Sequence, residues 1–321
     1  MDLIYTNHDR EDIGVLLDYD LDLAFGKDEN DFVLTMSAND HCMKTGYYIY
    51  MDGTDYGGIV DSVKSDSSKE EVTYSGRTWQ GVLNSKILAP DSGQDYLTVS
   101  GEANSVIGSL LARCGLSALF QASTTDSGIT IKSYQMNRYI SAYDGIIKML
   151  KTVGGKLYME YSNGSVMVSA VKAVDYSNDE EFDSDLVQLQ IEKTGNTCNH
   201  LICLGKGDLK ERTVIHLYAD SKGNISDKQT FTGLEEYAET YDYGNAESDD
   251  DLRSKGMEKL KELLAKDTIK VDLDSSDTRF DVGDIVGAYD SITDMQVSAE
   301  VSKKIVNVSN GNITITYEVG D

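Results

Sequence analysis

Residues 72–88, VTYSGRTWQGVLNSKIL, predict a β-strand that leads directly into a short amphipathic helix. Gly76 permits the sharp change of backbone direction between the extended and the helical segment. The apolar positions that follow recur at helical spacing, and they are Trp79, Val82, Leu83 and Ile87. One face of this helix must therefore be buried against the rest of the protein.

The chain ahead of this stretch contains five short runs with the composition of β-strands. These runs are residues 21–25, 32–37, 47–51, 56–63 and 71–75. Asp52-Gly53 is a tight-turn signal between the third run and the fourth. Short strands at regular spacing predict an antiparallel barrel or sandwich.

Helical periodicity replaces the strand pattern from about Leu97 onward. An apolar stripe over residues 106–111 ends near Gly115, a helix-stop signal. Ser141 with Asp144 forms a capping-box pattern, which is typical of a helix start and precedes a second apolar stripe.

A hairpin signal follows these two helices. Residues 157–161 and 166–170 flank the dipeptide Asn163-Gly164, which is the strongest turn signal in the sequence. Residues 97–174 are therefore expected to form a compact α+β domain.

The acidic residues 175–185 offer little to bury and predict a linker. Strands are expected again at residues 186–192, 198–204 and 213–218. A helix should start at Ser248, with three aspartates in its first turn and Lys266 near its end. Its buried stripe would consist of Leu252, Met257, Leu260, Leu263 and Leu264.

The end of the chain echoes its beginning. Three strand-like runs within residues 46–74 have counterparts in similar order within residues 283–317. Identity between the two segments is low, so duplication and chance similarity of hairpins both remain open. The sequence predicts three domains, which are a first β-barrel domain at 1–95, an α+β domain at 96–175 and a second β-barrel domain with one amphipathic helix at 176–321.

The Gly-Arg-Thr-Trp turn at residues 76–79, the strand-like residues 46–63 before it and the helix exit at 83–88 together resemble phage proteins. The chain resembles the baseplate-hub and tail-tip hub proteins of phage tails, the prophage tail protein family, and the hubs of contractile bacteriocins. Residues 205–212 resemble the Gly-x-Gly-Asp/Glu turn of the second barrel in such hubs. Lys86 departs mildly from the pattern, because those families often carry Arg there.

This resemblance implies a fold and a role. The implied fold is α+β and β-rich, with two antiparallel tube-like β-barrel domains flanking a small α+β domain. Three chains would present six barrel-like units around one axis, so a homotrimer could join the sixfold tail tube to a threefold spike or tip. The implied partners are a tail tube or distal tail protein, a spike or tip protein and the tape-measure protein.

Acidic residues outnumber basic ones by 55 to 29, which gives a formal net charge of −26. This charge argues against binding to nucleic-acid phosphates or anionic lipid, so no specific nucleic-acid binding is expected. Surface carboxylates that keep the protein soluble are one explanation, and a negatively lined channel through which DNA slides is the other.

Targeting signals and disulfides are not expected. Residues 1–12 lack the basic start and apolar stretch of a secretory signal, and no apolar run reaches the roughly 18 residues of a membrane-spanning helix. Synthesis in the host cytoplasm, no membrane anchor and a final place in the virion tail are therefore expected. The four cysteines are too few and too scattered for a disulfide framework.

The sequence patterns do not support the candidate zinc, phosphate and calcium sites. Cys198 and His200 would share one face of a strand while Cys203 points to the other, which does not suit the convergent ligands of zinc. Residues 205–212 lack the spacing of a phosphate-binding loop. Asp272, Asp274, Ser276 and Thr278 resemble the start of a calcium loop, but Asp277 stands where glycine is required. We predict no catalytic, cofactor-binding or metal-ligating residue and no cofactor.

Two other functions were weighed against the hub. The four histidines lie outside any hydrolase motif, whereas paired carboxylates are too abundant to exclude a tail-tip cell-wall hydrolase. The chain is expected to stop at its second barrel, which would leave no room for a lytic domain. A carbohydrate-binding tip protein is suggested by the 20 tyrosines, although tyrosines at strand spacing more often serve packing.

Overall fold

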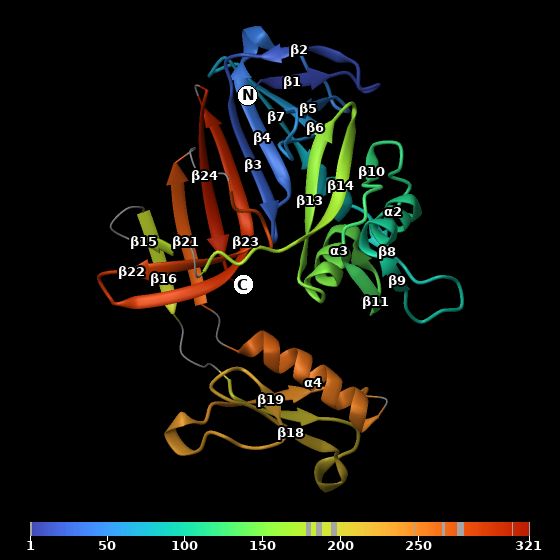
Figure 1. Cartoon of the computed structure of the whole chain (residues 1–321), viewed down its shortest axis with the longest axis vertical. Coiled ribbons are helices and arrows are strands. Elements are labelled where there is room, and N and C mark those ends of the chain that lie inside the picture. Colours follow the sequence, from blue (N-terminus) through green and yellow to red (C-terminus); the bar gives the residue numbers. More distant parts are fainter. Residues whose placement is uncertain are drawn as a thin grey trace. The chain divides into compact units, whose positions relative to one another are not determined.

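The protein is a β-rich α+β protein, as the sequence predicts (Figure 1). The computed structural model describes residues 2–177, 181–183, 188–193, 198–246, 248–264, 267–274, 279–309 and 311–320. Two compact units are present: unit 1 comprises Met1–Ile191 and Thr268–Asp321, and unit 2 comprises Glu192–Asp267. Within the described residues, no helix has both the length and the apolar character needed to cross a membrane.

The described part of unit 1 contains three α-helices and most of the strands. Its helices are α1 (Trp79–Asn84), α2 (Ala103–Arg113) and α3 (Ala142–Lys151). Its N-terminal strands are β1 (Leu3–Thr6), β2 (Asp12–Leu16), β3 (Asp20–Gly26), β4 (Asp31–Ser37), β5 (Tyr48–Tyr50), β6 (Gly57–Asp66), β7 (Glu71–Thr78) and β8 (Ile87–Leu88). The middle strands are β9 (Thr98–Glu102), β10 (Phe120–Ala122), β11 (Thr130–Gln135), β12 (Ile140–Ser141), β13 (Gly155–Ser162), β14 (Ser165–Lys172), β15 (Glu181–Asp183) and β16 (Gln188–Lys193). The C-terminal strands are β21 (Asp267–Asp274), β22 (Ile285–Asp290), β23 (Met295–Ser309) and β24 (Asn312–Val319).

One large sheet joins the two ends of the chain. Its strand order is β16-β21-β24-β23-β3-β4-β7-β6-β5-β1-β2, with β22 attached to β23. The junction is the antiparallel pair β3 and β23, in which Leu21 lies opposite Val308 and Phe25 lies opposite Lys304. The largest buried cluster contains residues from both sides of this junction, including Leu23, Leu34, Tyr74, Val306 and Ile315.

The predicted strand-to-helix transition is confirmed. β7 ends at Thr78, whose side-chain oxygen accepts a hydrogen bond from the backbone N–H of Gly81 and so caps α1. Trp79, Val82 and Leu83 are buried, as expected for one face of an amphipathic helix. The prediction for Ile87 is wrong, because α1 ends at Asn84 and Ile87 belongs to β8, where it is 57% exposed.

Gly76 has a different role from the predicted one. It lies inside β7 rather than at the transition, opposite an irregularity in the register of β6 between Val60 and Ser62. A Cβ atom on Gly76 would lie 1.9 Å from the backbone oxygen of Ile59. Glycine is therefore needed for the close approach of two strands at a bulge.

The predicted helices and hairpin of the middle segment are confirmed. The side chain of Ser141 caps α3 by accepting from the backbone N–H of Asp144. β13 and β14 pair in register around Asn163 and Gly164, which have φ angles of 51° and 77°. Positive φ at both central residues is the geometry that Asn-Gly favours in a hairpin. These elements surround a second buried cluster that also contains Trp79.

Several strands occur where none is predicted, among them β1, β2, β9, β11 and β20, and β15 lies within residues 175–185, where a linker is predicted. β1 and β2 form one edge of the large sheet, and β1 continues the sheet by pairing with β5. β1 (LIYT) and β2 (DIGVL) are only four and five residues long, which is too short to show a clear alternation of apolar and polar residues.

Unit 2 is a small sheet with one helix. Its strands are β17 (His200–Leu204), β18 (Val214–Ala219), β19 (Ile225–Ser226) and β20 (Ala238–Asp242), in the order β19-β18-β17-β20, and its helix is α4 (Asp249–Leu263). Ser248 caps α4 through the backbone N–H of Asp251, as predicted. Lys266 lies outside the described residues. Leu252 and Leu260 of α4 pack in the buried cluster of this unit.

The two segments that echo one another each form three consecutive antiparallel strands, β5–β7 and β22–β24. Duplication itself stays a prediction. The strand order of the large sheet is an open path in the part of the chain that is described, so the two tube-like barrels also stay a prediction. The domain boundaries that the sequence predicts at residues 95/96 and 175/176 also stay a prediction. The two compact units divide the chain at 191/192 and 267/268.

Candidate functional site

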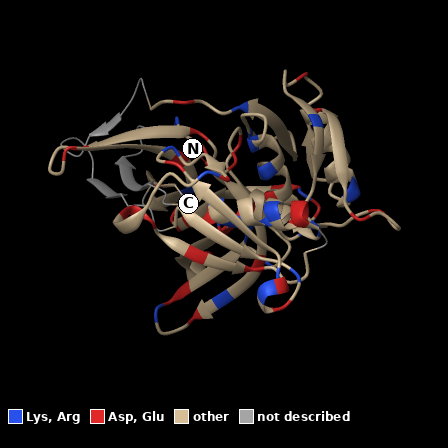
Figure 2. Cartoon of the chain, turned by 90° about the horizontal axis from the view of Figure 1, so that it is seen from below, with Lys and Arg blue, Asp and Glu red and all other residues tan. Residues whose placement is uncertain are grey.

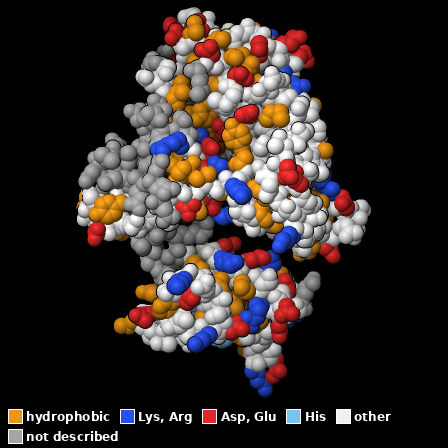
Figure 3. Space-filling view, in the orientation of Figure 1, with side chains coloured by type: hydrophobic (Ala, Val, Ile, Leu, Met, Phe, Trp, Pro, Cys, Tyr) orange, Lys and Arg blue, Asp and Glu red, His pale blue; other side chains and the backbone are white. Residues whose placement is uncertain are grey.

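Unit 1 contains a cavity of about 300 Å³ between the large sheet and the elements α1, α3 and β13. Its apolar wall consists of Phe25, Ile147, Leu157, Met159 and Ile313. Its polar wall includes Asp55, Gln80, Tyr143, Tyr158, Asp281 and Lys304. Figure 3 shows hydrophobic side chains together with acidic and basic ones along the middle of the drawn face of this unit.

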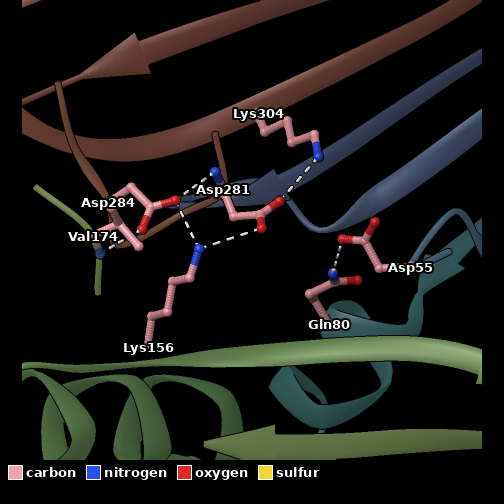
Figure 4. Close-up of polar contacts among 7 residues, drawn as sticks. All are labelled: Asp55, Gln80, Lys156, Val174, Asp281, Asp284 and Lys304. Atoms are coloured by element: carbon pink, nitrogen blue, oxygen red, sulfur yellow. Dashed lines mark hydrogen bonds and ion pairs between the residues drawn. The ribbon is translucent and has the colours of Figure 1, made fainter. Parts of the chain in front are cut away.

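Two lysines and two aspartates form a group of ion pairs beside this cavity, here called the ion cluster: Lys156, Asp281, Asp284 and Lys304 (Figure 4). Asp281 is half-buried, and the other three are buried. Lys156 Nζ lies 2.7 Å from Asp284 Oδ2 and 3.3 Å from Asp281 Oδ2. Lys304 Nζ lies 3.1 Å from Asp281 Oδ1. Asp281 thus bridges a lysine of β13 and a lysine of β23.

Asp284 is the most enclosed member of the ion cluster. Its side chain is 0% exposed and accepts hydrogen bonds from the backbone N–H groups of Val174 and Asp281, at 2.9 and 3.0 Å, in addition to Lys156. A buried carboxylate is tolerable only when it is paired and hydrogen-bonded in this way. The ion cluster therefore links the β13–β14 hairpin to the loop that precedes β22.

The backbone places both lysines where they must be buried. Lys304 takes the inward position of β23 that Val306 and Val308 take farther along the strand. Lys156 packs against Gly283, which has a φ of 99° and on which a Cβ atom would lie 2.9 Å from Lys156 Cβ. A side chain at position 283 would therefore collide with the stem of Lys156.

Asp55 and Gln80 lie on another part of the cavity wall and point toward one another (Figure 4). Gln80 Nε2 donates to Asp55 Oδ2 at 3.1 Å. Gln80 is only 4% exposed, and its Oε1 atom has no hydrogen-bond partner among the described residues. An unpaired buried oxygen costs about 1–3 kcal/mol, so Gln80, which lines the cavity, carries an acceptor that favours a donor.

The pKa shifts describe the charges in this cavity. Burial raises the pKa of Asp55 above its ordinary value, although the charge of Lys304 opposes that shift. Burial alone would lower the pKa of Lys304, but the negative charges of Asp55 and Asp281 raise it, and the net shift is upward. Burial raises the pKa of Tyr158 to about 12, and its hydrogen bond to Glu160 adds to the effect. Lys304 therefore stays charged at neutral pH.

The ion cluster joins separate segments of the chain, and the cavity beside it is suited to binding. Both ammonium groups of the ion cluster are held by carboxylates, which leaves neither as a free amine. Among the residues that the structure describes, no group of three or more His, Cys, Asp or Glu could hold a metal ion.

The sequence did not reveal the ion cluster, because Lys156 and Asp284 are 128 positions apart. One signal was present. Lys304 occupies an inward position on an otherwise apolar face of its strand, and a lysine there must find a carboxylate partner inside the protein.

The structure separates the residues of the suspected zinc site. β17 begins at His200, so strict alternation does not reach Cys198, which lies in the same buried cluster as Cys203. His200 faces other partners: its Nδ1 atom lies 2.6 Å from Glu236 Oε1, and its Nε2 atom lies 2.8 Å from His216 Nδ1. The expectation that Cys198 shares a face with His200 is not met.

The other two suspected sites have different outcomes. Ser276 and Thr278 of the calcium-like pattern lie outside the described residues. Residues 205–213 form the connection between β17 and β18, closed by backbone hydrogen bonds of Gly205 and Lys206 with Thr213. A turn was predicted there, and a turn is found.

Acidic residues occur on strands and loops throughout the described chain, with basic residues among them (Figure 2). Several exposed carboxylates are paired, as in the two-point contact of Arg77 with Asp61. The excess negative charge is therefore spread over the surface, as expected for a chain with a formal charge of −26.

Comparison with known proteins identifies the fold. No protein-family model and no curated protein matches this chain. Solved structures do match it, and three of them, all tail proteins, do so over nearly its whole length. A tail protein from Neisseria meningitidis MC58 has 14% identity and a TM-score of 0.56, with 100% of this chain and 96% of that chain covered. The 43 kDa tail protein of prophage MuSo2 from Shewanella oneidensis has 10% identity and a TM-score of 0.61, with 99% and 97% covered. The prophage tail protein gp18 from Listeria monocytogenes EGD-e has 13% identity and a TM-score of 0.52, with 99% and 94% covered. The predicted likeness to phage tail proteins is thus confirmed as a shared fold.

Proposed function

We propose that this chain is a structural hub at the end of a phage tail or of a related contractile bacteriocin, where it forms a homotrimer. The main support is a fold shared with three tail proteins over nearly the full length of both partners.

The hub would adapt one symmetry to another. Each chain would supply two tube-like barrel units, one built around β5–β7 and the other around β22–β24, which share one sheet through β3 and β23. Three chains would then present six such units to the tail tube or distal tail protein and a threefold surface to a spike or tip protein.

The net negative charge of the chain would give the hub a negatively charged lumen. Carboxylates that line a channel repel DNA phosphate, so the genome and the tape-measure protein would pass without sticking. The chain would be made in the host cytoplasm, act in the virion tail, and need neither cofactor nor membrane anchor. Repulsion among three chains of −26 each would be offset by subunit contacts that are apolar or paired.

Electron cryomicroscopy of purified tails that carry an affinity-tagged copy of this chain tests the hub. We expect threefold density for the chain at the end of the tube opposite the head, with the tag labelled at that end only. Label along the tube or on the sheath, or tails with no label, would contradict the hub.

The two other functions predict different results. A hydrolase would clear peptidoglycan in a gel assay and lose that activity when one carboxylate pair is changed to amides. A carbohydrate-binding tip protein would bind a glycan array. Buried tyrosines argue against the second, because Tyr74, Tyr161 and Tyr317 lie in the hydrophobic clusters. We expect no activity in the first assay and no binding in the second.

A further inference from the structure

We propose that the cavity of unit 1 binds an alkylguanidinium or alkylammonium group, which is the chemistry of an arginine or lysine side chain. This inference goes beyond the hub role and does not depend on it. Three properties of the cavity carry it: its balance of formal charges, an unpaired acceptor in its wall, and an apolar wall of suitable size.

The charges around the cavity leave a place for one cation. Asp55, Asp281 and Lys304 line the cavity, and Lys156 and Asp284 form an ion pair beside it, so three carboxylates stand against two ammonium groups. Both lysines form ion pairs with Asp281 or Asp284, whereas Asp55 is hydrogen-bonded to the neutral amide of Gln80 and receives only the longer-range charge of Lys304. A further positive charge beside Asp55 would complete the pairing, and an anion there would add to the uncompensated charge.

The hydrogen-bonding groups of the wall favour a donor. Gln80 already donates to Asp55, so its buried Oε1 atom is left as an acceptor without a partner. A guanidinium or ammonium group supplies several N–H donors and accepts none. Such a group can therefore satisfy Gln80 Oε1 and the Asp55 carboxylate together.

The remaining wall fits an apolar stem. Ile147, Leu157 and Met159 lie around the same cavity, whose volume is about 300 Å³. This volume is at the lower end of the range of about 300–1,000 Å³ found for ligand cavities, so the occupant is the size of a side chain. A short alkyl chain with a cationic head combines the two kinds of contact.

Two sources can present this chemistry. One is a free small organic cation, and the other is a lysine or arginine side chain of a neighbouring protein. The strongly acidic surface of this chain attracts both. The experiment below separates them.

Calorimetric titration of the full chain with n-propylguanidinium and with n-propylurea tests the proposal. The two probes have nearly the same shape, but only the first is charged. Trp79 is the only tryptophan of the chain and precedes Gln80, so its fluorescence reports binding in a second way. We expect saturable binding of n-propylguanidinium and at least tenfold weaker binding of n-propylurea. Equal binding of the two probes, or no binding of either, would overturn the proposal.

Asp55→Asn and the matched control Asp95→Asn locate the site. Asp95 is an exposed carboxylate that does not line the cavity. Asp55→Asn should weaken n-propylguanidinium binding at least tenfold, and Asp95→Asn should leave it unchanged. Unchanged binding in Asp55→Asn would show that the cation binds elsewhere and would overturn the proposal. The comparison of the two probes on the unaltered chain holds even if a variant fails to fold.

A capped peptide, Gly-Gly-Arg-Gly-Gly, and its citrulline counterpart distinguish the sources. Binding of the arginine peptide as tight as that of n-propylguanidinium, and lost with citrulline, would assign the cavity to a side chain of another protein. Binding of the free cation alone would assign it to a small molecule. Either result supports a cation site.

Discussion

The two units bury polar groups in different ways. In unit 1, the ion cluster contains four charged side chains from distant parts of the sequence, and every charge has an opposite partner. In unit 2, His200 shares one hydrogen bond with Glu236 and another with His216, and its ring stacks on Tyr218. The ion cluster is an all-or-none arrangement, because loss of one member leaves a buried charge of another member without its partner. The histidine contacts of unit 2 can instead be lost one at a time. Unit 1 should therefore lose stability in large steps and unit 2 in small ones.

Removal of one member of the ion cluster should have the strongest consequence. Asp284→Ala leaves Lys156 buried beside one remaining carboxylate and removes the acceptor of two backbone N–H groups. We expect a loss of about 3–5 kcal/mol in the free energy of unfolding, measured by urea denaturation of unit 1. Asp95→Ala, which changes an exposed carboxylate, is the matched control and should cost about 0.5 kcal/mol or less. A loss under about 1 kcal/mol for Asp284→Ala would refute the all-or-none description.

A packing change in α4 tests unit 2 by itself. A Cβ atom on Gly256 would lie 2.4 Å from Cys203 Sγ, so Gly256→Ala should overpack the core and cost about 1–3 kcal/mol. Helix propensity alone predicts the opposite, a gain of about 1 kcal/mol. Hydrogen exchange should speed up in residues 198–264 and stay unchanged in unit 1. Slower exchange in α4 would mean that the close approach is not real.

Acid should weaken one helix cap of unit 1. Burial raises the pKa of Glu102, but hydrogen bonds from Ser127, Asn104 and Ser105 outweigh it and hold the pKa at about 2 against an ordinary 4.5. The folded-state pKa is therefore depressed, so the stabilisation is fully present above about pH 4.5 and is lost as the pH falls toward 2.

Glu102→Gln measures this cap. The variant should lose about 1 kcal/mol at pH 7, and the gap to the unaltered chain should narrow between pH 4.5 and pH 3. Urea denaturation at each pH gives the two curves. A gap that is independent of pH would show that the carboxylate charge of Glu102 is not what stabilises α2.

The mildest change concerns the histidine contacts of unit 2. Glu236→Gln keeps the shape of the side chain but weakens the contact with His200 Nδ1. We expect a local loss of about 1 kcal/mol or less, seen as faster hydrogen exchange in residues 227–237. Glu235→Gln changes the exposed neighbour and should leave exchange as it is. Global unfolding in Glu236→Gln would show that unit 2 is as cooperative as the ion cluster.

Local signals predicted the local structure well. Ser141 with Asp144, Asn163-Gly164 and Ser248 each mark a boundary within a few residues, because caps and tight turns depend on nearby backbone groups. The prediction for Ile87 failed because the apolar spacing continues past Ser85, where the backbone leaves the helix.

Long-range features could not be predicted in the same way. The pairing of β3 with β23 and the contact of Lys156 with Asp284 join residues that are far apart along the chain. The sequences of β3 and β23 do not specify which strand each will pair with, because many apolar strands could pair equally well. The cavity forms only where these distant segments pair. No local sequence pattern therefore identifies Asp55 and Gln80 as residues of a site.

The mass of the purified full chain in solution tests the hub most directly. Light scattering at moderate salt, where repulsion between charged chains is screened, should give three times 35.3 kDa. A trimer is the state that joins a sixfold tube to a threefold tip, so this result would support the hub. A mass of one chain at every concentration, both alone and after co-expression with tube and spike proteins, would contradict it.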